Sequence, residues 1–434
     1  MKEAFKYWLD CYKEGKSLII KYLIAGITAA VVTIFANKLQ LDHITYFNAI
    51  LSITAFTLII SFGITCAVGI FINHNNDIES RNRNIKVGFL YITGLTSIIF
   101  VLLFVFKDFV LNTLLRIKVD NDAFYYTMIM FFFFECFVSY FQDIFKVTKK
   151  YKYQLIDFIA TSFATIAGLF ALYFTNNLSL TNIGFLYMSV SFCNLLILFV
   201  VVCKMYNLNI FDLSNLKITQ KEQSTIIYSI ALQSIWQVGY TLLSYYILRI
   251  NDKTFNTYSY FDNTLDVIVG LFYTFANISL IRIETLIGKG KKEEAYALAK
   301  KTLWGILYVW ITYTSIVLVL YGVVLKGLNA ELVSNGKETL IMYCALNLIR
   351  FYSWGLTSYI LIAGGWVKYQ VKLFTGSLIY YLILFIIAPN FSNLEIYLSL
   401  FLESAVVVTL SAIMFKKKEW LTISYKDNPQ SNNK

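Results

Sequence analysis

The chain has 434 residues, of which 58% are hydrophobic and only 15% are charged. Soluble domains usually carry about a quarter charged residues, so this composition excludes an ordinary soluble protein and favours a membrane protein. The net charge of +11 at pH 7 fits membrane topology and anionic lipid, and we expect no nucleic-acid partner. Because the six Cys form no CxxC pair and there are only two His, we expect no metal centre and no cofactor.

The first segment, residues 1–16, is charged and amphipathic, and we expect it to remain as an uncleaved cytoplasmic N-terminus. Apolar runs follow. A transmembrane helix needs about 20 predominantly apolar residues. The sequence predicts twelve such helices, at 17–36, 44–73, 86–106, 123–145, 154–174, 182–204, 224–249, 257–283, 302–325, 338–363, 370–388 and 395–415.

Lys and Arg are distributed unevenly over the segments between these runs. With the N-terminus in the cytoplasm, the inner segments hold 27 Lys and Arg and the outer loops hold 8. Positive charge is enriched on the cytoplasmic side of membrane proteins. We therefore expect a multi-pass protein of the cell's inner membrane with both termini in the cytoplasm.

Short motifs recur at half the chain length. The tripeptide KYQ occurs at 152–154 and again at 368–370, and the inner loop within 68–91 resembles the one within 283–308 at nearly the same offset. Two pairs of similar segments at nearly the same spacing indicate an internal repeat, in which a six-helix unit occurs twice. Six is even, so the copies should be two lobes related by a pseudo-two-fold axis along the membrane normal. The all-α fold then divides into 1–16, an N-lobe at 17–204, a cytoplasmic linker at 205–223, a C-lobe at 224–415 and a basic tail at 416–434.

The segment LIGKGKKEEAYALAKK at 286–301 is read as a surface turn and helix. No GxxxxGK[ST] motif and no preceding strand support a phosphate loop. Gly288 and Gly290 suit a tight turn, and the residues after them favour a helix with acidic residues first and basic residues last.

At three places the sequence resembles a known family. LIGKGKKEEAYALAKK, ILIAGGWVKYQVKLF and FKVTKKYKYQLIDF are similar to segments of the multidrug and toxic compound extrusion (MATE) transporters, members of the multidrug/oligosaccharidyl-lipid/polysaccharide (MOP) flippase superfamily. The resemblance implies two six-helix lobes forming a V, alternating access, and export driven by inward Na+ or H+.

The chain departs from this family at several positions. Members often have a proline near the start of spans 1 and 7, whereas this chain has only Pro389 and Pro429. The positions of the family's usual carboxylates are occupied here by Val32, Gln237 and Tyr352. The coupling ion is therefore left open, and so is the flippase alternative.

Charged residues inside apolar spans are costly and are candidates for function. The candidate ion-coupling residues are Glu135, Asp157, Asp266, Arg350 and Glu403. The structural alternative is an ion pair between helices, for example Arg350 with Glu403. Aromatic residues in the more polar spans can bind organic cations, so the predicted substrate cavity contains Trp236, Gln237, Tyr240 and Tyr352.

These features favour a secondary exporter of organic cationic or neutral compounds over other classes. The alternative is a flippase for lipid-linked oligosaccharide or polysaccharide precursors. A membrane enzyme is not expected, because no long soluble loop is available for a catalytic site. The expected partners are the small-molecule or lipid-linked substrate, the coupling ion and membrane lipids, and we expect a monomer.

Overall fold

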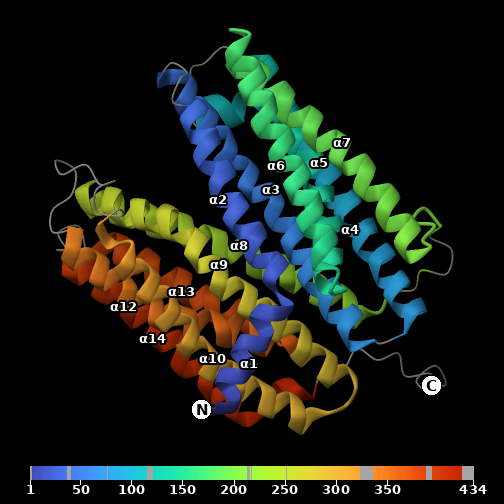
Figure 1. Cartoon of the computed structure of the whole chain (residues 1–434), viewed down its shortest axis with the longest axis vertical. Helices are drawn as coiled ribbons and strands as arrows, with labels where there is room; N and C mark the ends of the chain where they lie inside the picture. The colour runs from blue at the N-terminus through green and yellow to red at the C-terminus, as the bar shows by residue number, and fades with distance from the viewer. Residues whose placement is uncertain are drawn as a thin grey trace. The chain divides into compact units, whose positions relative to one another are not determined.

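The computed structural model describes residues 2–36, 41–75, 77–114, 121–212, 216, 218–250, 252–322, 336–387 and 393–422. The regular elements in these ranges are helices (Figure 1). Each of the twelve runs predicted from the sequence lies mainly on a helix. Seven of the described helical segments are long and apolar enough to cross a membrane: Ile78–Val105, Asp122–Val147, Tyr151–Phe174, Leu180–Tyr206, Val267–Gly288, Lys292–Val319 and Glu395–Lys417.

The chain forms two compact units. Unit 1 contains Met1–Leu23, Asn73–Asn76 and Ile235–Lys434, and unit 2 contains Ile24–Ile72 and Asp77–Ser234. Helices α2 and α8 each contribute residues to both units. The bounds of these units differ from the lobes expected at 17–204 and 224–415. The division into two lobes of six spans therefore stays a prediction.

Unit 2 is built around a pair of closely packed helices, α5 and α7. It contains most of α2 (Lys16–Ala36) and α3 (Leu41–His74), followed by α4 (Ile78–Val105), the short π-helix η1 (Phe109–Leu114), α5 (Asp122–Val147), α6 (Tyr151–Phe174), α7 (Leu180–Tyr206) and the first half of α8 (Gln220–Ile250). Polar side chains start several of these helices as N-caps. The Asp77 carboxylate, for example, accepts a hydrogen bond of 2.6 Å from the backbone N–H of Ser80.

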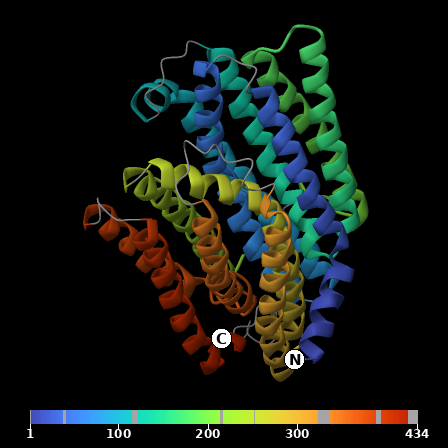
Figure 2. The same cartoon turned by 60° about the vertical axis from the view of Figure 1, so that its left-hand side comes forward.

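Unit 1 contains the helices of the second half together with the first helix of the chain. These are α1 (Lys2–Glu14), α9 (Asp252–Gly288), α10 (Lys292–Val319), α12 (Gly336–Trp354), the π-helix η2 (Gly355–Leu361), α13 (Val367–Ile387), α14 (Asn393–Lys417) and the 3-10 turn η3 (Glu419–Leu421). Helix α1 lies against α9 and α10, as Figures 1 and 2 both show. The N-terminal segment is thus part of a packed unit.

The turn between α9 and α10 has the conformation expected from its glycines. Helix α9 ends at Gly288, and Gly290 has a φ of +77°. Helix α10 then begins at Lys292 with Glu293 and Glu294 in its first turn. The predicted surface helix is therefore the first part of one continuous helix, which carries on into the membrane-spanning segment.

A buried tryptophan near the C-terminal end of the described residues completes a hydrophobic cluster of unit 1. Trp420 is fully buried in a cluster with Ile287, Ala299, Ile360 and Phe415. Its ring stacks on Phe415 with centroids 5.8 Å apart. The backbone of residue 364 approaches so closely that only glycine fits, because a Cβ on Gly364 would lie 1.8 Å from the carbonyl oxygen of Trp420.

Candidate functional site

A polar stripe runs along one face of α5. Glu135, Ser139, Gln142 and Lys146 are spaced by four, three and four residues, which places them on one face of a helix with 3.6 residues per turn. The rest of this helix is dominated by aromatic and aliphatic side chains. A polar face on an apolar span requires partners inside the protein, and neighbouring helices supply them.

Glu135 has its partner on α7. The hydroxyl of Ser191 donates a hydrogen bond of 2.9 Å to the Glu135 carboxylate, and Ser191 is buried between the two helices. Hydrogen bonds to charged groups are stronger than those between neutral groups. This contact holds the carboxylate oxygen in a defined position in the middle of α5.

Asp157 lies further along, on α6. The amide of Gln142 donates to its carboxylate at 2.6 Å. Seven residues separate Glu135 from Gln142 along α5, which corresponds to about 10 Å at 1.5 Å per residue. Glu135 and the contact between Gln142 and Asp157 therefore lie at two successive levels along the stripe of α5. The two acids do not form one compact cluster.

Asp143 is a buried acid of the same helix that the sequence analysis did not select. Its two carboxylate oxygens bind the Thr65 hydroxyl of α3 at 3.0 Å and the Lys146 ammonium at 2.7 Å. The pairing with Lys146 gives Asp143 a structural role at the end of the stripe. The sequence contains a pattern that indicates this pair, because Asp143 and Lys146 carry opposite charges three residues apart and are neighbours on one helix face.

Val32 is the residue that the sequence analysis predicts at the position of a family carboxylate. It packs against the apolar core of unit 2, a cluster that includes Phe35 and Phe132. Within unit 2, Glu135 and Asp157 are the candidates from the sequence analysis that carry negative charge.

The predicted cavity residues of the second half lie in unit 1. Trp236 is exposed and Gln237 is half-buried, both on α8, and Tyr352 is half-buried on α12, just before η2. The side chains of Tyr240 and Asp266 lie outside the described residues. Because Val32, Glu135 and Asp157 belong to unit 2, the structure divides the predicted site residues between the two units.

Arg350 and Glu403 do not form the ion pair that was the structural alternative. The described ion pairs of unit 1 do not join these two residues. Arg350 is buried on α12, whereas Glu403 is half-buried on α14 and accepts a hydrogen bond of 3.2 Å from the neighbouring Ser404 hydroxyl. Their roles therefore have to be tested separately.

A second buried acid was missed by the sequence analysis. Glu284, at the end of α9, is only 2% exposed and accepts a hydrogen bond of 2.8 Å from the Asn73 amide. His74, which follows Asn73 in the chain, is fully buried, and its Nε2 donates a hydrogen bond of 2.9 Å to the Ala363 carbonyl. Glu284 was placed in a surface loop because its partner is 211 residues away in the sequence, and no local pattern reveals such a pairing.

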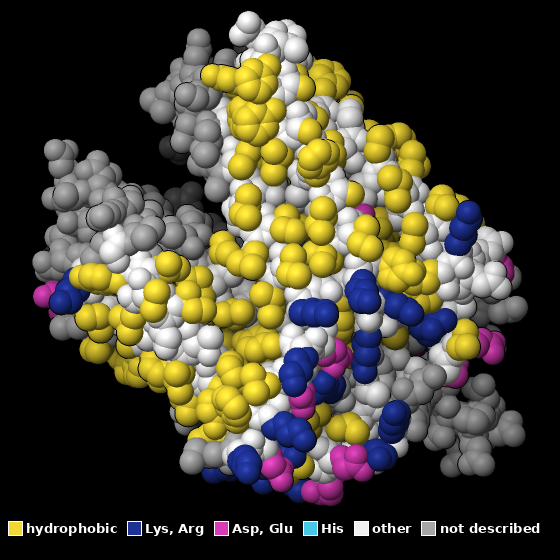
Figure 3. Space-filling model, viewed as in Figure 1, with side chains coloured by type: hydrophobic (Ala, Val, Ile, Leu, Met, Phe, Trp, Pro, Cys, Tyr) yellow, Lys and Arg dark blue, Asp and Glu magenta, His cyan; other side chains and the backbone are white. Residues whose placement is uncertain are grey.

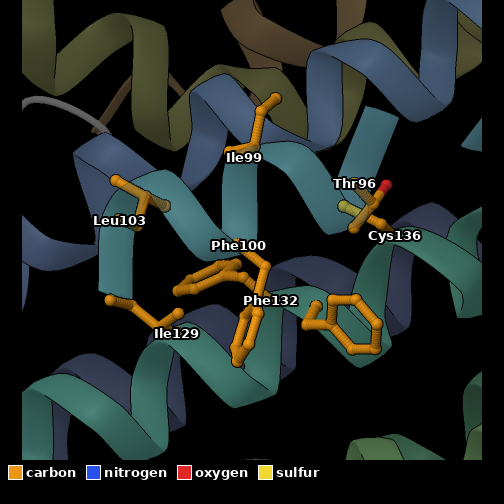
Figure 4. Close-up of a pocket in the computed structure, with 8 residues that line it drawn as sticks. Thr96, Ile99, Phe100, Leu103, Ile129, Phe132 and Cys136 are labelled. Atoms are coloured by element: carbon orange, nitrogen blue, oxygen red, sulfur yellow. The ribbon is translucent and has the colours of Figure 1, made fainter. Parts of the chain in front are cut away.

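A small apolar pocket lies between α4 and α5 in unit 2 (Figure 4). Thr96, Ile99, Phe100 and Leu103 line it from α4, and Ile129, Phe132, Phe133 and Cys136 from α5. No charged group lines this pocket, so it provides neither ion coordination nor selection for a charged compound. Among the described residues, no three His, Cys, Asp or Glu side chains come together as a metal site either.

Comparisons with known proteins identify the fold. No protein-family model matches the sequence, and no curated protein matches it. The structure resembles that of the Vibrio cholerae MATE transporter VcmN with a TM-score of 0.81 and 9% sequence identity, covering 96% of this chain and 98% of that one. The chain has the fold of the MATE transporters.

Two further solved structures resemble this chain over nearly its whole length. One is the MATE transporter ClbM in complex with Rb+, with a TM-score of 0.75, 12% identity and coverage of 95% and 97%. The other is a MOP superfamily transporter from Pyrococcus furiosus, with a TM-score of 0.75, 10% identity and coverage of 94% and 97%. The MATE fold and the seven apolar helices identify the chain as a multi-pass membrane protein.

Proposed function

We propose that the chain is a secondary active exporter of organic cationic or neutral amphiphilic compounds, coupled to inward Na+ or H+ by alternating access. The observation that carries this proposal is the polar stripe of α5, where the Glu135 carboxylate is fixed by Ser191 in the middle of an otherwise apolar helix. A carboxylate inside a membrane span costs free energy, and such residues are usually functional.

Coupling follows from the charge of this stripe. A proton or Na+ bound at Glu135 neutralises the carboxylate and lowers the free-energy cost of exposing its helix face to an apolar environment. An ion that binds one conformation more tightly than the other shifts the equilibrium between them. Glu135 and Asp157 would act as successive stations for the ion along α5 and α6, and Asp266 remains the candidate in the second half.

A second function is favoured by a specific observation. Arg350 is a buried cation in a predicted span of the second half, and Val32 replaces a carboxylate often found in the family. Both differences lower the negative charge available for a cationic cargo. Export of a lipid-linked oligosaccharide or polysaccharide precursor, whose phosphates are anionic, is therefore the alternative.

Transport by purified protein in lipid vesicles separates the two functions. Vesicles with an imposed pH or Na+ gradient would be given cationic dyes in one arm and lipid-linked sugars in the other. We expect gradient-dependent dye movement, which falls to the rate of empty vesicles in Glu135→Gln at equal protein abundance. The matched control is Glu403→Gln, a half-buried acid of α14 in unit 1, which we expect to keep most of the activity.

The outcomes distinguish the proposals clearly. Full gradient-driven dye export by Glu135→Gln would place the coupling site elsewhere. Movement of lipid-linked sugar without any gradient, together with no dye export by the unaltered protein, would establish the flippase alternative. In that case Arg350→Gln should slow sugar movement, whereas Glu135→Gln should leave it unchanged.

We also propose that the protein works as a monomer in the inner membrane, with both termini in the cytoplasm. The excess of Lys and Arg in alternate loops supports this orientation.

A further inference from the structure

Helix α1 divides its surface into four sectors. At 100° per residue, Ala4, Tyr7 and Cys11 form one face, and all three are buried. Going around the helix, the next sector is apolar, the third is basic and the fourth is acidic. The apolar residues are Phe5, Trp8, Leu9 and Tyr12, the basic residues are Lys2, Lys6 and Lys13, and the acidic residues are Glu3, Asp10 and Glu14.

The buried face and the acidic sector attach α1 to unit 1. The Tyr7 hydroxyl donates to the Ser279 hydroxyl of α9 at 2.8 Å. Glu14 pairs with Arg282 of α9 at 2.5 Å, and Glu3 pairs with Lys301 of α10 at 2.8 Å. The Lys301 ammonium lowers the pKa of Glu3. These contacts at both ends of the helix fix its rotation about its own axis.

The apolar sector continues an exposed apolar face of α10. Phe5 is 44% exposed and Leu9 is 37% exposed. The Phe5 and Trp8 rings lie 5.4 Å and 6.0 Å from the ring of Tyr308 on α10. Tyr308 lies on the same face of α10 as three exposed apolar residues spaced by seven, Trp304, Ile311 and Leu318. Because α10 is long and apolar enough to cross a membrane, the apolar sector of α1 adjoins a face that would contact lipid.

The basic sector adjoins this apolar sector and has no ion-pair partner among the residues that the structure describes. Lys2, Lys6 and Lys13 are exposed, and none of them forms an ion pair with another described residue. In the part of the surface where α1 lies, hydrophobic and basic side chains are adjacent (Figure 3). Amphipathic helices with this arrangement lie in the membrane interface, with aromatic and aliphatic residues in the lipid and Lys at the headgroups.

We propose that α1 is an interfacial helix that binds anionic phospholipid headgroups through Lys2, Lys6 and Lys13 while Phe5 and Leu9 insert below them. In the acidic sector Glu3 and Glu14 are paired with Lys301 and Arg282, which reduces the repulsion of anionic lipid. This proposal rests on the membrane location of the chain and holds for either cargo. Each lysine near an anionic surface contributes about 1 kcal/mol, which corresponds to roughly fivefold enrichment of anionic lipid per lysine.

The test uses Trp8 as a reporter in lipid nanodiscs. Nanodiscs contain equal amounts of phosphatidylglycerol and phosphatidylcholine, with brominated acyl chains on only one of the two lipids, because bromine quenches nearby tryptophan fluorescence. The signal of Trp8 is the difference between the unaltered protein and Trp8→Phe. We expect Trp8 to be quenched several-fold more strongly by brominated phosphatidylglycerol than by brominated phosphatidylcholine.

Two triple variants decide whether the lysines cause this preference. In K2Q/K6Q/K13Q we expect the two lipids to quench Trp8 equally. The matched control K149Q/K150Q/K152Q removes three exposed lysines from unit 2 and should keep the preference. Gel filtration confirms that each variant remains folded.

Three results would overturn the proposal. Absence of lipid quenching of Trp8 would show that α1 faces water. Equal quenching by both lipids in the unaltered protein would show an interfacial helix without anionic selectivity. Loss of the preference in both triple variants alike would attribute it to total charge. None of these results depends on transport, so failure here is distinct from failure of the proposed function.

Discussion

The start of α8 depends on one buried ion pair, which makes Glu222→Gln an informative change. Arg83 of α4 donates two hydrogen bonds to the Glu222 carboxylate, at 2.7 Å and 2.9 Å. The same carboxylate accepts the backbone N–H of Thr219 at 2.8 Å, and the Thr219 hydroxyl accepts the N–H of Glu222. This reciprocal arrangement is a capping box that begins the helix.

The expected loss of stability follows from burial. Removing one partner of a buried ion pair typically costs about 3–5 kcal/mol, because the other charge is left uncompensated. The Glu222 side chain is 7% exposed and the Arg83 side chain is 20% exposed. Since Arg83 keeps some contact with solvent, we expect the lower end, about 3 kcal/mol, for Glu222→Gln. Replacing both residues by Met should cost less than this single change, because no unpaired charge remains.

The pair also predicts a dependence on pH. Burial acts to raise the pKa of Glu222, but hydrogen bonds from Arg83 and Thr219 outweigh it and hold the pKa below its ordinary value of 4.5. A lowered pKa in the folded state means that the stabilisation is fully present above pH 4.5 and is lost as the pH falls below it. In Glu222→Gln this part of the acid sensitivity should disappear.

Thermal unfolding in detergent between pH 3 and pH 7, a range that brackets the ordinary Glu pKa of 4.5, measures both effects. Glu222→Gln should unfold at a clearly lower temperature than the unaltered protein at neutral pH, and the difference should narrow in acid. The control is Glu419→Gln, an acid of η3 outside any described ion pair. Equal stability of Glu222→Gln and the unaltered protein at pH 7 would refute the view that this pair contributes to folding.

Three further changes test other parts of the structure. Gly364→Val should destabilise unit 1 by at least the 1–3 kcal/mol or so typical of overpacking, since its Cβ would meet the Trp420 backbone; an unchanged melting temperature would contradict this. Trp420→Ala should lower stability by about 3–5 kcal/mol, because a large ring leaves a buried cluster, and urea unfolding would measure the loss. Cys placed at Lys150 and Lys292 should react with impermeant maleimide only from the cytoplasmic side, and Cys at Asn176 only from outside; labelling of Lys292 from outside would refute the topology.

Helix positions were predictable because apolar runs and end signals are local. The run predicted at 123–145 corresponds to Asp122–Val147, and the one at 154–174 to Tyr151–Phe174. Helix α8 begins earlier than predicted, at Gln220, because the capping box of Thr219 and Glu222 starts it before the apolar run. This T-x-x-E pattern is visible in the sequence and would have given the correct start.

Other features had no local signal. The π-helix Gly355–Leu361 interrupts the run predicted at 338–363, and a change of hydrogen-bond register leaves apolar composition unaltered. Glu284 is hydrogen-bonded to Asn73 at the end of α3, which is 211 residues away in the sequence. Glu135 stands out in the sequence as a charge in an apolar span, but its partner Ser191 is an ordinary polar residue of another helix, and only the structure identifies it.

The make-up of unit 1 has a consequence for biosynthesis. Helix α1 is translated before all other described helices, yet its hydrogen bond from Tyr7 to Ser279 spans 272 residues. Trp420 follows the last long helix and is needed to fill the cluster around Ile287 and Ile360. Unit 1 therefore cannot finish folding until both are available, whereas unit 2 is complete once Ser234 has been made. During synthesis α1 must wait at the ribosome or membrane without its partners, and a ribosome that stalls before residue 420 leaves an open unit for quality-control proteases to recognise.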